Sequence, residues 1–412
     1  KDINFRPHRI KSGSTDISKV FIESLISHIK SSVKPVLYVG GGCLNSGLKA
    51  SEELIKFAEL TNIPVTTTLH GLGCYPGNGK LSIGMLGMHG TYEANLAMHN
   101  CDLMINVGAR FDDRITGRLD AFSPNSTKFH FDIDKSSINK NVNVDFSTNT
   151  DIAHALSALN LYIKSNNIEF NHNQISNWWG QIKEWQKTNC LNYEQGDEII
   201  KPQHAIARLN ELTKNKETIV TTEVGQHQMW AAQYFQFNKP NSWITSGGLG
   251  TMGFGMPAAI GAQMANPDAL VIDIAGEASF LMNIQEIATA VQYKLPIKIF
   301  ILNNEYMGMV RQWQELMHGS RYSESYVDAL PDFVKLAESF HAVGLRAKNL
   351  SELDDTINEM MSVNRPVIVD VWVDKKENVF PMIPSGAAHN EMLLSKYDKE
   401  KPENQEKGKV LV

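Results

Sequence analysis

The feature that most constrains the fold is an alternation of short apolar, β-branched runs with amphipathic stretches, which recurs in two separate parts of the chain. Strands that are buried on both faces have continuous runs of Val, Ile and Leu, and the helices between parallel strands cover both faces of the sheet. The apolar runs lie at residues 35–42, 63–69, 101–108 and 128–134, and again at residues 218–225, 269–276, 295–304 and 365–373. The sequence therefore predicts an α/β fold with two doubly wound parallel sheets.

Composition limits the class of protein. The 412 residues correspond to two or three domains at about 150 residues per domain. Hydrophobic residues make up 42%, charged residues 20%, and the mean hydropathy is -0.25, values typical of a globular protein. A net charge of -6 provides no basic field for nucleic acid or an anionic membrane, and no apolar run approaches the ~20 residues of a membrane span. The four cysteines have neither zinc-site nor redox-motif spacing. We therefore expect a cytoplasmic protein with reduced thiols, which binds small molecules or another protein, and neither nucleic acid nor a membrane.

Breaks in the pattern divide the chain into four parts. Residues 1–163 hold the first alternation, and residues 164–200 begin with a polar, Asn-rich run before three tryptophans at helical spacing. Residues 201–385 hold the second alternation. Residues 386–412 end in a charged stretch without apolar periodicity from residue 396 onward, which is typical of a solvated or disordered tail. We expect two α/β domains, joined by a linker with a packing helix and followed by a tail.

Polar residues follow two apolar runs of the second domain where each run should leave the sheet. Glu277 comes directly after residues 269–276, and Asn304 ends the run 295–304, 27 residues later. Because a right-handed crossover makes consecutive strands parallel, both side chains should lie at the carboxyl edge, where such sheets bind ligands. A carboxylate and an amide oxygen suit Mg²⁺, which usually keeps phosphate and water ligands as well. The alternative is that Glu277 caps a helix and Asn304 forms a turn.

Two further segments offer contacts for an anion at the same edge. Residues 247–255 contain five glycines ahead of a helix-like stretch, so that backbone N–H groups can approach a phosphate. Residues 221–230, TTEVGQHQMW, end a strand with Gly225 and provide Gln226 and His227 as polar contacts. Three such strand ends together predict a diphosphate held through Mg²⁺.

These motifs together resemble a known family. The Gly-Glu pair at residues 276–277 and the Asn-Asn pair at residues 303–304 are similar to the thiamine-diphosphate motif. With GQHQMWAAQ, SGGLGTMGFG and MGMVRQWQ, the chain resembles the catalytic large subunit of acetohydroxyacid synthase, also called acetolactate synthase, from residue 35 to about residue 394. The resemblance implies a transferase of branched-chain amino acid biosynthesis. Such an enzyme decarboxylates pyruvate on thiamine diphosphate and joins the two-carbon unit to a second 2-oxo acid, pyruvate or 2-oxobutyrate.

The resemblance implies roles for residues around thiamine diphosphate. Glu277, Asn304 and the carbonyl of Tyr306 would hold Mg²⁺, with Glu277 standing where the family commonly has Asp. Met252 or Met309 would support the thiazolium, and Trp313 would shape the pocket of the acceptor 2-oxo acid, unless Trp313 belongs to the core. The residues expected to surround the cofactor are Val224, Gly225, Gln226, His227, Gly250, Met252, Ala278, Ser279, Met307, Gly308 and Met309.

The resemblance also implies that the first domain binds FAD, in a role without net redox chemistry. Arg110 and Arg114 would pair with phosphates, and Asp132 would contact ribose or adenine. Arg110 would also orient the carboxylate of the acceptor. The residues alone fit an ordinary dinucleotide site or a surface charge cluster equally well. The residues expected at FAD are Gly40, Gly41, Thr67, Leu69, Met88, His89, Gly108, Ala109, Arg110, Asp112, Arg114, Asp132, Ile133 and Asp151.

The family activates its cofactor with a glutamate on a separate N-terminal domain, which the other subunit of a dimer supplies. No residue of this chain is assigned that role. We therefore expect about 150 further residues before residue 1 of the natural protein, and no catalysis by this chain alone. The resemblance also implies a homodimer or tetramer and a separate regulatory small subunit. Two other interpretations stay open: another thiamine-diphosphate-dependent 2-oxo acid decarboxylase or oxidase, and an inactive cofactor-binding fragment or regulatory pseudo-enzyme.

Overall fold

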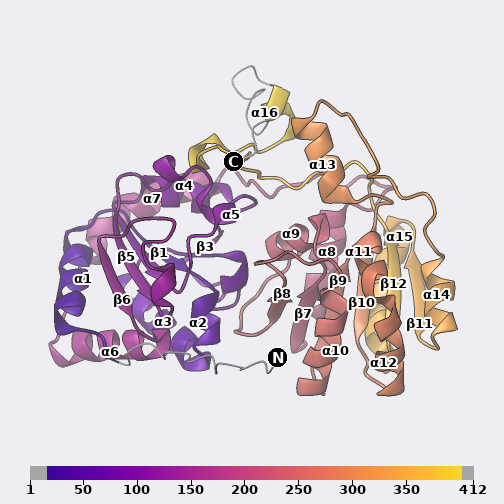
Figure 1. The fold of residues 1–412 in the computed structure, drawn as a ribbon, viewed down its shortest axis with the longest axis horizontal. Helices are drawn as coiled ribbons and strands as arrows, with labels where there is room; N and C mark the ends of the chain where they lie inside the picture. Colours follow the sequence, from indigo (N-terminus) through magenta and orange to yellow (C-terminus); the bar gives the residue numbers. More distant parts are fainter. Residues whose placement is uncertain (1–15, 401–412) are drawn as a thin grey trace, which may run out of the picture.

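The computed structural model describes residues 16–400 and contains two six-stranded sheets that lie side by side, each flanked by helices (Figure 1). Every pairing between neighbouring strands in both sheets is parallel. The predicted α/β class with two doubly wound parallel sheets is confirmed. Among the described residues, no helix combines the length and the apolar character that crossing a bilayer requires.

The first sheet has the strand order β3-β2-β1-β4-β5-β6, so the order reverses between β1 and β4. Its strands are β1 (Pro35–Val39), β2 (Val65–Thr67), β3 (Ser82–Met85), β4 (Leu103–Val107), β5 (Thr127–Asp132) and β6 (Phe146–Asn149). The helices around it are α1 (Lys19–Ser31), α2 (Gly41–Asn45), α3 (Leu48–Thr61), α4 (Tyr92–Asn100), α5 (Asp113–Thr116), α6 (Ile152–Ser165) and α7 (Ser176–Gln186). All residues of β1 and β4 are buried, because α1, α3 and α6 cover one face while α4 and α7 cover the other.

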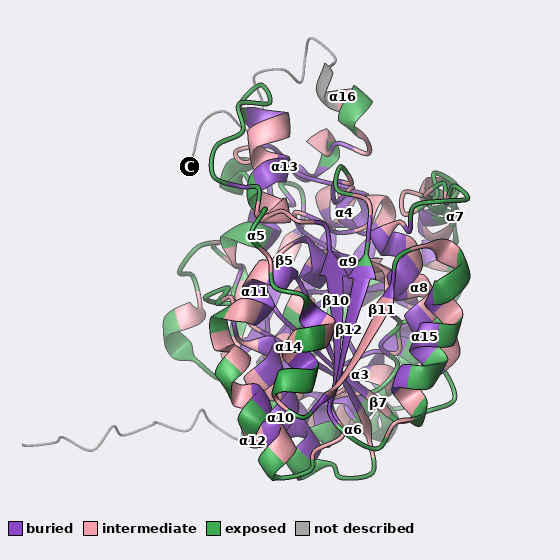
Figure 2. Cartoon of the chain, turned by 90° about the vertical axis from the view of Figure 1, so that its right-hand side faces the viewer, coloured by how far each residue is buried: buried purple, intermediate pink, exposed green. Residues whose placement is uncertain are grey.

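The second sheet has the strand order β11-β12-β10-β9-β7-β8 and reverses between β7 and β9. Its strands are β7 (Thr218–Thr222), β8 (Trp243–Thr245), β9 (Leu270–Ala275), β10 (Lys298–Asn303), β11 (Val343–Ala347) and β12 (Val367–Trp372). The remaining α-helices are α8 (Pro202–Thr213), α9 (Gln226–Tyr234), α10 (Gly255–Ala265), α11 (Glu277–Phe280), α12 (Ile287–Gln292), α13 (Gly308–Met317), α14 (Phe333–Ser339), α15 (Leu350–Ser362) and α16 (Lys396–Glu400). The 3-10 helices are η1 (Leu69–Gly71), η2 (Leu119–Ala121), η3 (Lys135–Ser137), η4 (His172–Ile175), η5 (Leu281–Glu286) and η6 (His389–Glu391). Figure 2 shows the buried central strands of this sheet between helices that are exposed on their outer sides.

Local sequence explains where several helices begin. Ser18, Thr91 and Asp151 accept a backbone N–H from the first turn of α1, α4 and α6, respectively. After β9 the chain turns into α11 directly at Glu277 and continues through η5 into α12. Gly276 follows β9 in an extended conformation and is the N-cap of α11.

The predicted packing helix is α7, and it packs against the first sheet. The indole N–H of Trp178 donates to the carbonyl of Pro35 at 3.1 Å, and that of Trp179 donates to the carbonyl of Asn62 at 2.9 Å. Both indoles therefore hold α7 to the first domain.

Residues 374–395, which we call the C-terminal strap, run from β12 past α13 to the first domain (Figure 1). Met382 and Leu393 exchange two backbone hydrogen bonds, and His389 and Leu393 are buried. The predicted tail begins at residue 386, but residues 386–395 are part of the folded structure, because Ala387 and His389 bond to the first domain and Leu393 pairs with Met382. The tail's charged end forms α16, and residues 401–412 lie outside the described part of the chain.

Candidate functional site

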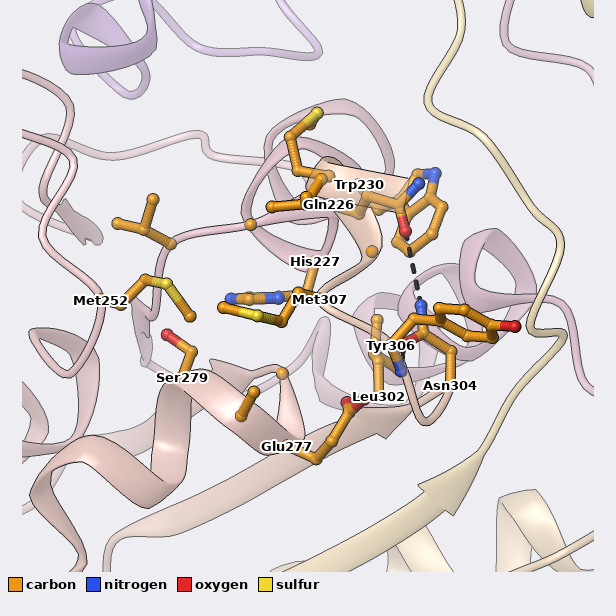
Figure 3. A pocket seen from close by; sticks show the side chains of 17 residues that line it. Gln226, His227, Trp230, Met252, Glu277, Ser279, Leu302, Asn304, Tyr306 and Met307 are labelled. Carbon is orange, nitrogen blue, oxygen red and sulfur yellow. Dashed lines mark hydrogen bonds between the residues drawn. The ribbon is translucent and has the colours of Figure 1, made fainter. Parts of the chain in front are cut away.

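A pocket with about 470 Å³ of space, partly open to solvent, lies at the carboxyl edge of the second sheet (Figure 3). It lies where β7, β9 and β10 end, beside the reversal of strand order at which open α/β sheets bind ligands. The lining residues are Val224, Gly225, Gln226, His227, Trp230, Met252, Gly276, Glu277, Ala278, Ser279, Leu302, Asn304, Tyr306, Met307, Gly308, Met309 and Val310. Every residue predicted around thiamine diphosphate except Gly250 lines this pocket, and a Cβ on Gly250 would lie 3.8 Å from Val224.

Glu277 is the most perturbed acid of the pocket. Its side chain is 1% exposed, and its Oε1 has no hydrogen-bond partner. Burial raises the pKa of Glu277 to about 8, while backbone N–H groups of Glu277, Tyr306 and Asn304 oppose the rise. A carboxylate oxygen that is buried without a partner is one that a bound cation would satisfy.

Asn304 faces the same pocket and belongs to a chain of side-chain amides. Its Nδ2 donates to Oε1 of Gln226 at 3.4 Å (Figure 3), and its Oδ1 accepts the N–H of Tyr306 at 3.0 Å. Nε2 of Gln226 donates in turn to Oε1 of Gln312 at 2.9 Å and to the carbonyl of Glu377 at 3.0 Å. The orientation of Asn304 is therefore tied to residues outside the pocket lining.

The glycines of the pocket are required by close packing. A Cβ on Gly225 or on Gly276 would lie 2.7 Å from a ring atom of His227, and a Cβ on Gly308 would lie 2.1 Å from Oε1 of Gln226. Desolvation lowers the pKa of His227 to about 3, so the imidazole is neutral, and its Nε2 is buried without a partner. These glycines let the polar side chains reach the centre of the site.

Glu223, which the sequence analysis did not select, fixes the Gly-rich segment beside the pocket. Its carboxylate accepts the N–H of Gly253 at 2.6 Å, the N–H of Met256 at 3.1 Å and the hydroxyl of Ser279 at 3.2 Å. Glu223 therefore connects the segment that carries Met252 to the Ser279 side of the pocket. The pKa of the nearby Asp273 carboxyl lies well above its usual range, because burial raises it most and the charge of Glu223 raises it further.

Trp313 is not among the residues that line this pocket. It lies on α13 and is partly buried against a cluster of Leu316, Met317 and Met382, against which Phe380 of the C-terminal strap also packs. Its role at the acceptor substrate stays a prediction.

The glycines predicted at FAD lie at the reversal between β1 and β4. A Cβ on Gly40 would lie 2.4 Å from the carbonyl oxygen of Gly108, so the close approach of these two turns already requires glycine. Arg110 follows the second turn and pairs with Asp112, which begins α5. The other predicted residues on the neighbouring turns are Gly41, Thr67, Leu69 and Ala109.

A second group of the predicted residues contacts the C-terminal strap. The N–H of Met88 donates to the carbonyl of Arg114 at 2.9 Å, and the carbonyl of Met88 accepts the N–H of Ile383 at 2.8 Å. Nδ1 of His89 lies 3.0 Å from the carbonyl of Pro381, and burial lowers the pKa of His89 to about 4. These residues are thus held by a segment almost 300 positions away in sequence.

The last group lies at the ends of β5 and β6. Asp132 is buried and accepts a backbone N–H two residues later, whereas Ile133 is 50% exposed. Asp151 accepts the N–H of His154 at 3.2 Å and the hydroxyl of Ser46 at 2.7 Å. The carboxylate of Asp151 thus has a structural role at the start of α6.

Comparison with known proteins gives this geometry a family. Residues 223–371 match the thiamine pyrophosphate enzyme C-terminal TPP binding domain, and residues 22–159 match the thiamine pyrophosphate enzyme central domain. The chain belongs to the thiamine pyrophosphate enzymes. Its first sheet is the central domain of that family, and the pocket lies in the TPP binding domain.

Curated relatives within the family are acetolactate synthases. The acetolactate synthase isozyme 3 large subunit of Escherichia coli is 45% identical over 381 residues, which are 92% of this chain and 66% of that protein. The large subunit of Haemophilus influenzae is 45% identical, over 89% of this chain and 64% of that protein. The chloroplastic acetolactate synthase 2 of Zea mays is 43% identical, over 91% of this chain and 59% of that protein. The chain therefore spans slightly less than two thirds of the length of these relatives.

The residues of the pocket fit Mg²⁺ and a diphosphate. The unpartnered Oε1 of Glu277 and the amide of Asn304 are hard oxygen donors. Within residues 16–400, no three or more His, Cys, Asp and Glu side chains gather into a metal site of their own. A cation here would therefore take its other ligands from backbone carbonyls, water or a diphosphate, which is the usual arrangement for Mg²⁺.

Proposed function

We propose that this protein is the catalytic large subunit of an acetolactate synthase, which decarboxylates pyruvate and joins the two-carbon unit to a second 2-oxo acid, pyruvate or 2-oxobutyrate. The observation that carries the proposal is the buried Glu277 carboxylate, whose Oε1 has no hydrogen-bond partner, in a pocket of the TPP binding domain. The 43–48% identity to acetolactate synthases over about 90% of the chain supports this reaction.

Thiamine diphosphate, when bound, supplies the electron sink for the loss of CO₂. Glu277, the amide oxygen of Asn304 and the carbonyl of Tyr306 would hold Mg²⁺. Met252 would provide an apolar contact for the rings, since a thioether adapts to irregular surfaces. The neutral imidazole of His227 brings no positive charge into the site.

We further propose that the first domain binds FAD without net redox chemistry. Arg110 follows the turn at Gly108, and the carbonyl of Arg114 accepts the N–H of Met88. The exposed guanidinium groups of both arginines provide charges for a diphosphate. Their present partners, Asp112 and Asp113, are also exposed, so exchange for a phosphate would cost little.

The proposal extends to partners and location. A homodimer or tetramer is supported by Leu249, which is 95% exposed in the Gly-rich segment that also carries Met252. The printed name "large subunit" of the relatives supports a separate regulatory small subunit. A cytoplasmic location is supported by four free thiols, of which burial raises the pKa of Cys101 and Cys190 to about 11.

The function is tested by adding pyruvate, thiamine diphosphate, Mg²⁺ and FAD to the full-length natural protein and to this 412-residue chain. We expect the full-length protein to form acetolactate and the 412-residue chain by itself to form none. Release of acetaldehyde or acetyl phosphate alone would overturn the proposal. Binding of thiamine diphosphate without turnover in the full-length protein would favour a regulatory pseudo-enzyme instead.

A further inference from the structure

Gln312 lies on α13 outside the pocket lining, and its side-chain amide is completely buried. Its Oε1 accepts the N–H of Val379 at 2.7 Å and an N–H of Gln226 at 2.9 Å. Its Nε2 donates to the carbonyl of Val379 at 3.2 Å. One side chain thus binds both backbone groups of a strap residue while it also contacts a pocket residue.

The backbone of Val379 fixes which end of the Gln312 amide is oxygen. A backbone N–H can only donate, so the atom of Gln312 that faces it must be the acceptor, Oε1. Since that oxygen also faces Gln226, the facing atom of Gln226 must be the donor, Nε2. The backbone of Val379 therefore sets the polarity of the Gln312 amide, and Gln312 and the carbonyl of Glu377 together set that of Gln226.

The same sequence of donors and acceptors continues to the metal position. With Nε2 of Gln226 bound to Gln312 and to the carbonyl of Glu377, Oε1 of Gln226 remains to accept from Asn304. Nδ2 of Asn304 is thereby directed toward Gln226. The N–H of Tyr306 donates to Oδ1 at 3.0 Å and favours the same orientation, so Oδ1 is the oxygen that a cation could use. A reversed Asn304 amide would present an NH₂ group to the cation.

We propose that Gln312 is a positioning residue for the Mg²⁺ site, which acts through Gln226 on the amide of Asn304. The inference rests on the proposed function, because Asn304 is a metal ligand only if the pocket holds Mg²⁺. Partners in the outer shell of a metal ligand typically change metal affinity 10- to 100-fold when they are removed. Gln312 should therefore affect Mg²⁺ affinity although it touches neither the cation nor the cofactor.

The test uses Gln312→Met, which keeps the length of the side chain but removes both polar groups. The matched control is Gln263→Met, because Gln263 is also a buried glutamine but bonds only to carbonyls at the end of α10. Thiamine diphosphate binding is followed in the full-length protein by quenching of tryptophan fluorescence, since Trp230 lines the pocket. Mg²⁺ is titrated at fixed thiamine diphosphate, and thiamine diphosphate is then titrated at saturating Mg²⁺.

We expect Gln312→Met to raise the Mg²⁺ concentration for half-maximal binding about 10-fold or more, and Gln263→Met to change it less than about twofold. The dissociation constant of thiamine diphosphate at saturating Mg²⁺ should stay within about twofold of the wild-type value. General structural damage would weaken the binding of both ligands instead of Mg²⁺ alone. Gln312→Glu should recover most of the affinity, because a protonated carboxyl can accept from Gln226 and donate to Val379. If Gln312→Met does not fold, Gln312→Asn is used with the same expected results. The asparagine side chain is too short to reach both Gln226 and Val379.

A folded Gln312 variant with an unchanged Mg²⁺ requirement would overturn this inference alone. So would equal losses of affinity for Mg²⁺ and for thiamine diphosphate. Wild-type protein that binds thiamine diphosphate with no dependence on Mg²⁺, or not at all, would overturn the proposed function and this inference with it.

Discussion

His389 attaches the C-terminal strap to the first domain, and its titration should make the protein less stable below neutral pH. Its Nε2 lies 2.6 Å from the carbonyl oxygen of Ile115, so the neutral ring donates a hydrogen bond there. Its Nδ1 is buried without a partner, and the residue is 1% exposed. A second proton would add a charge to a buried ring, and burial accordingly lowers the pKa of His389 from 6.5 to about 4.

The sign of the pH dependence follows from these two pKa values. Because the pKa in the folded state is lower, the unfolded chain binds more protons between pH 4 and pH 6.5, and stability rises with pH across this window. The contribution of His389 is fully present above pH 6.5 and is lost as the pH falls through 4. The difference corresponds to about 3.4 kcal/mol in total, of which about 2.5 kcal/mol would be lost at pH 4.5.

Urea unfolding of wild type and His389→Gln at about pH 7.5 and pH 4.5 measures this contribution. Glutamine keeps an N–H donor for Ile115 but does not titrate. The variant should lose about 2.5 kcal/mol less than wild type between the two pH values, since the carboxyl groups contribute equally to both proteins. The exposed His318 provides the control, His318→Gln, which should behave as wild type. A difference below about 0.5 kcal/mol between wild type and His389→Gln would refute the reasoning.

Three further predictions concern the pocket and its surroundings. Gly308→Ala should weaken thiamine diphosphate binding at least about tenfold, because its Cβ would lie 2.1 Å from a pocket side chain. The control is Gly261→Ala, whose Cβ would meet no atom within 4 Å. It should leave binding, measured by calorimetry, unchanged and should raise stability, measured by thermal unfolding, by up to about 1 kcal/mol. Glu277→Ala should raise the Mg²⁺ requirement at least about tenfold, and an unchanged requirement excludes Glu277 as a ligand. Asp151→Ala should cost about 1 kcal/mol in chemical unfolding, with recovery in Asp151→Asn; weaker flavin binding at unchanged stability would instead assign Asp151 to the cofactor.

The sequence identified every interior strand of both sheets and no edge strand. The predicted apolar runs are β1, β2, β4 and β5 in the first sheet, and β7, β9, β10 and β12 in the second. The strands that were not predicted are β3, β6, β8 and β11, which are the two edges of each sheet. Interior strands are covered by helices on both faces and need a continuous apolar run, whereas β6 and β11 are mostly half-buried and tolerate mixed residues.

The site residues that could be predicted are the polar residues that come directly after a strand. Glu277 and Asn304 are next to β9 and β10, so their meeting follows from a parallel crossover between adjacent strands. Glu223 follows β7 in the same way, but its carboxylate turns away to accept backbone N–H groups of the Gly-rich segment. Gln312 has no such position, since its partner Val379 is 67 residues away. No local pattern indicates that contact.

Residues with recognisable chemistry are therefore held in place by residues without it. The pocket reaches the C-terminal strap through Gln226 and Gln312, and the turn that carries Met88 and His89 reaches the same strap at Ile383 and Pro381. Nε2 of Gln233, on α9, also donates to the carbonyl of His89 at 2.9 Å and to the carbonyl of Phe380 in the strap at 3.2 Å. Because these bonds share a single segment, detaching the strap would loosen both the pocket and part of the predicted flavin site. The stability of the strap is thus a property that a motif search omits and that both sites require.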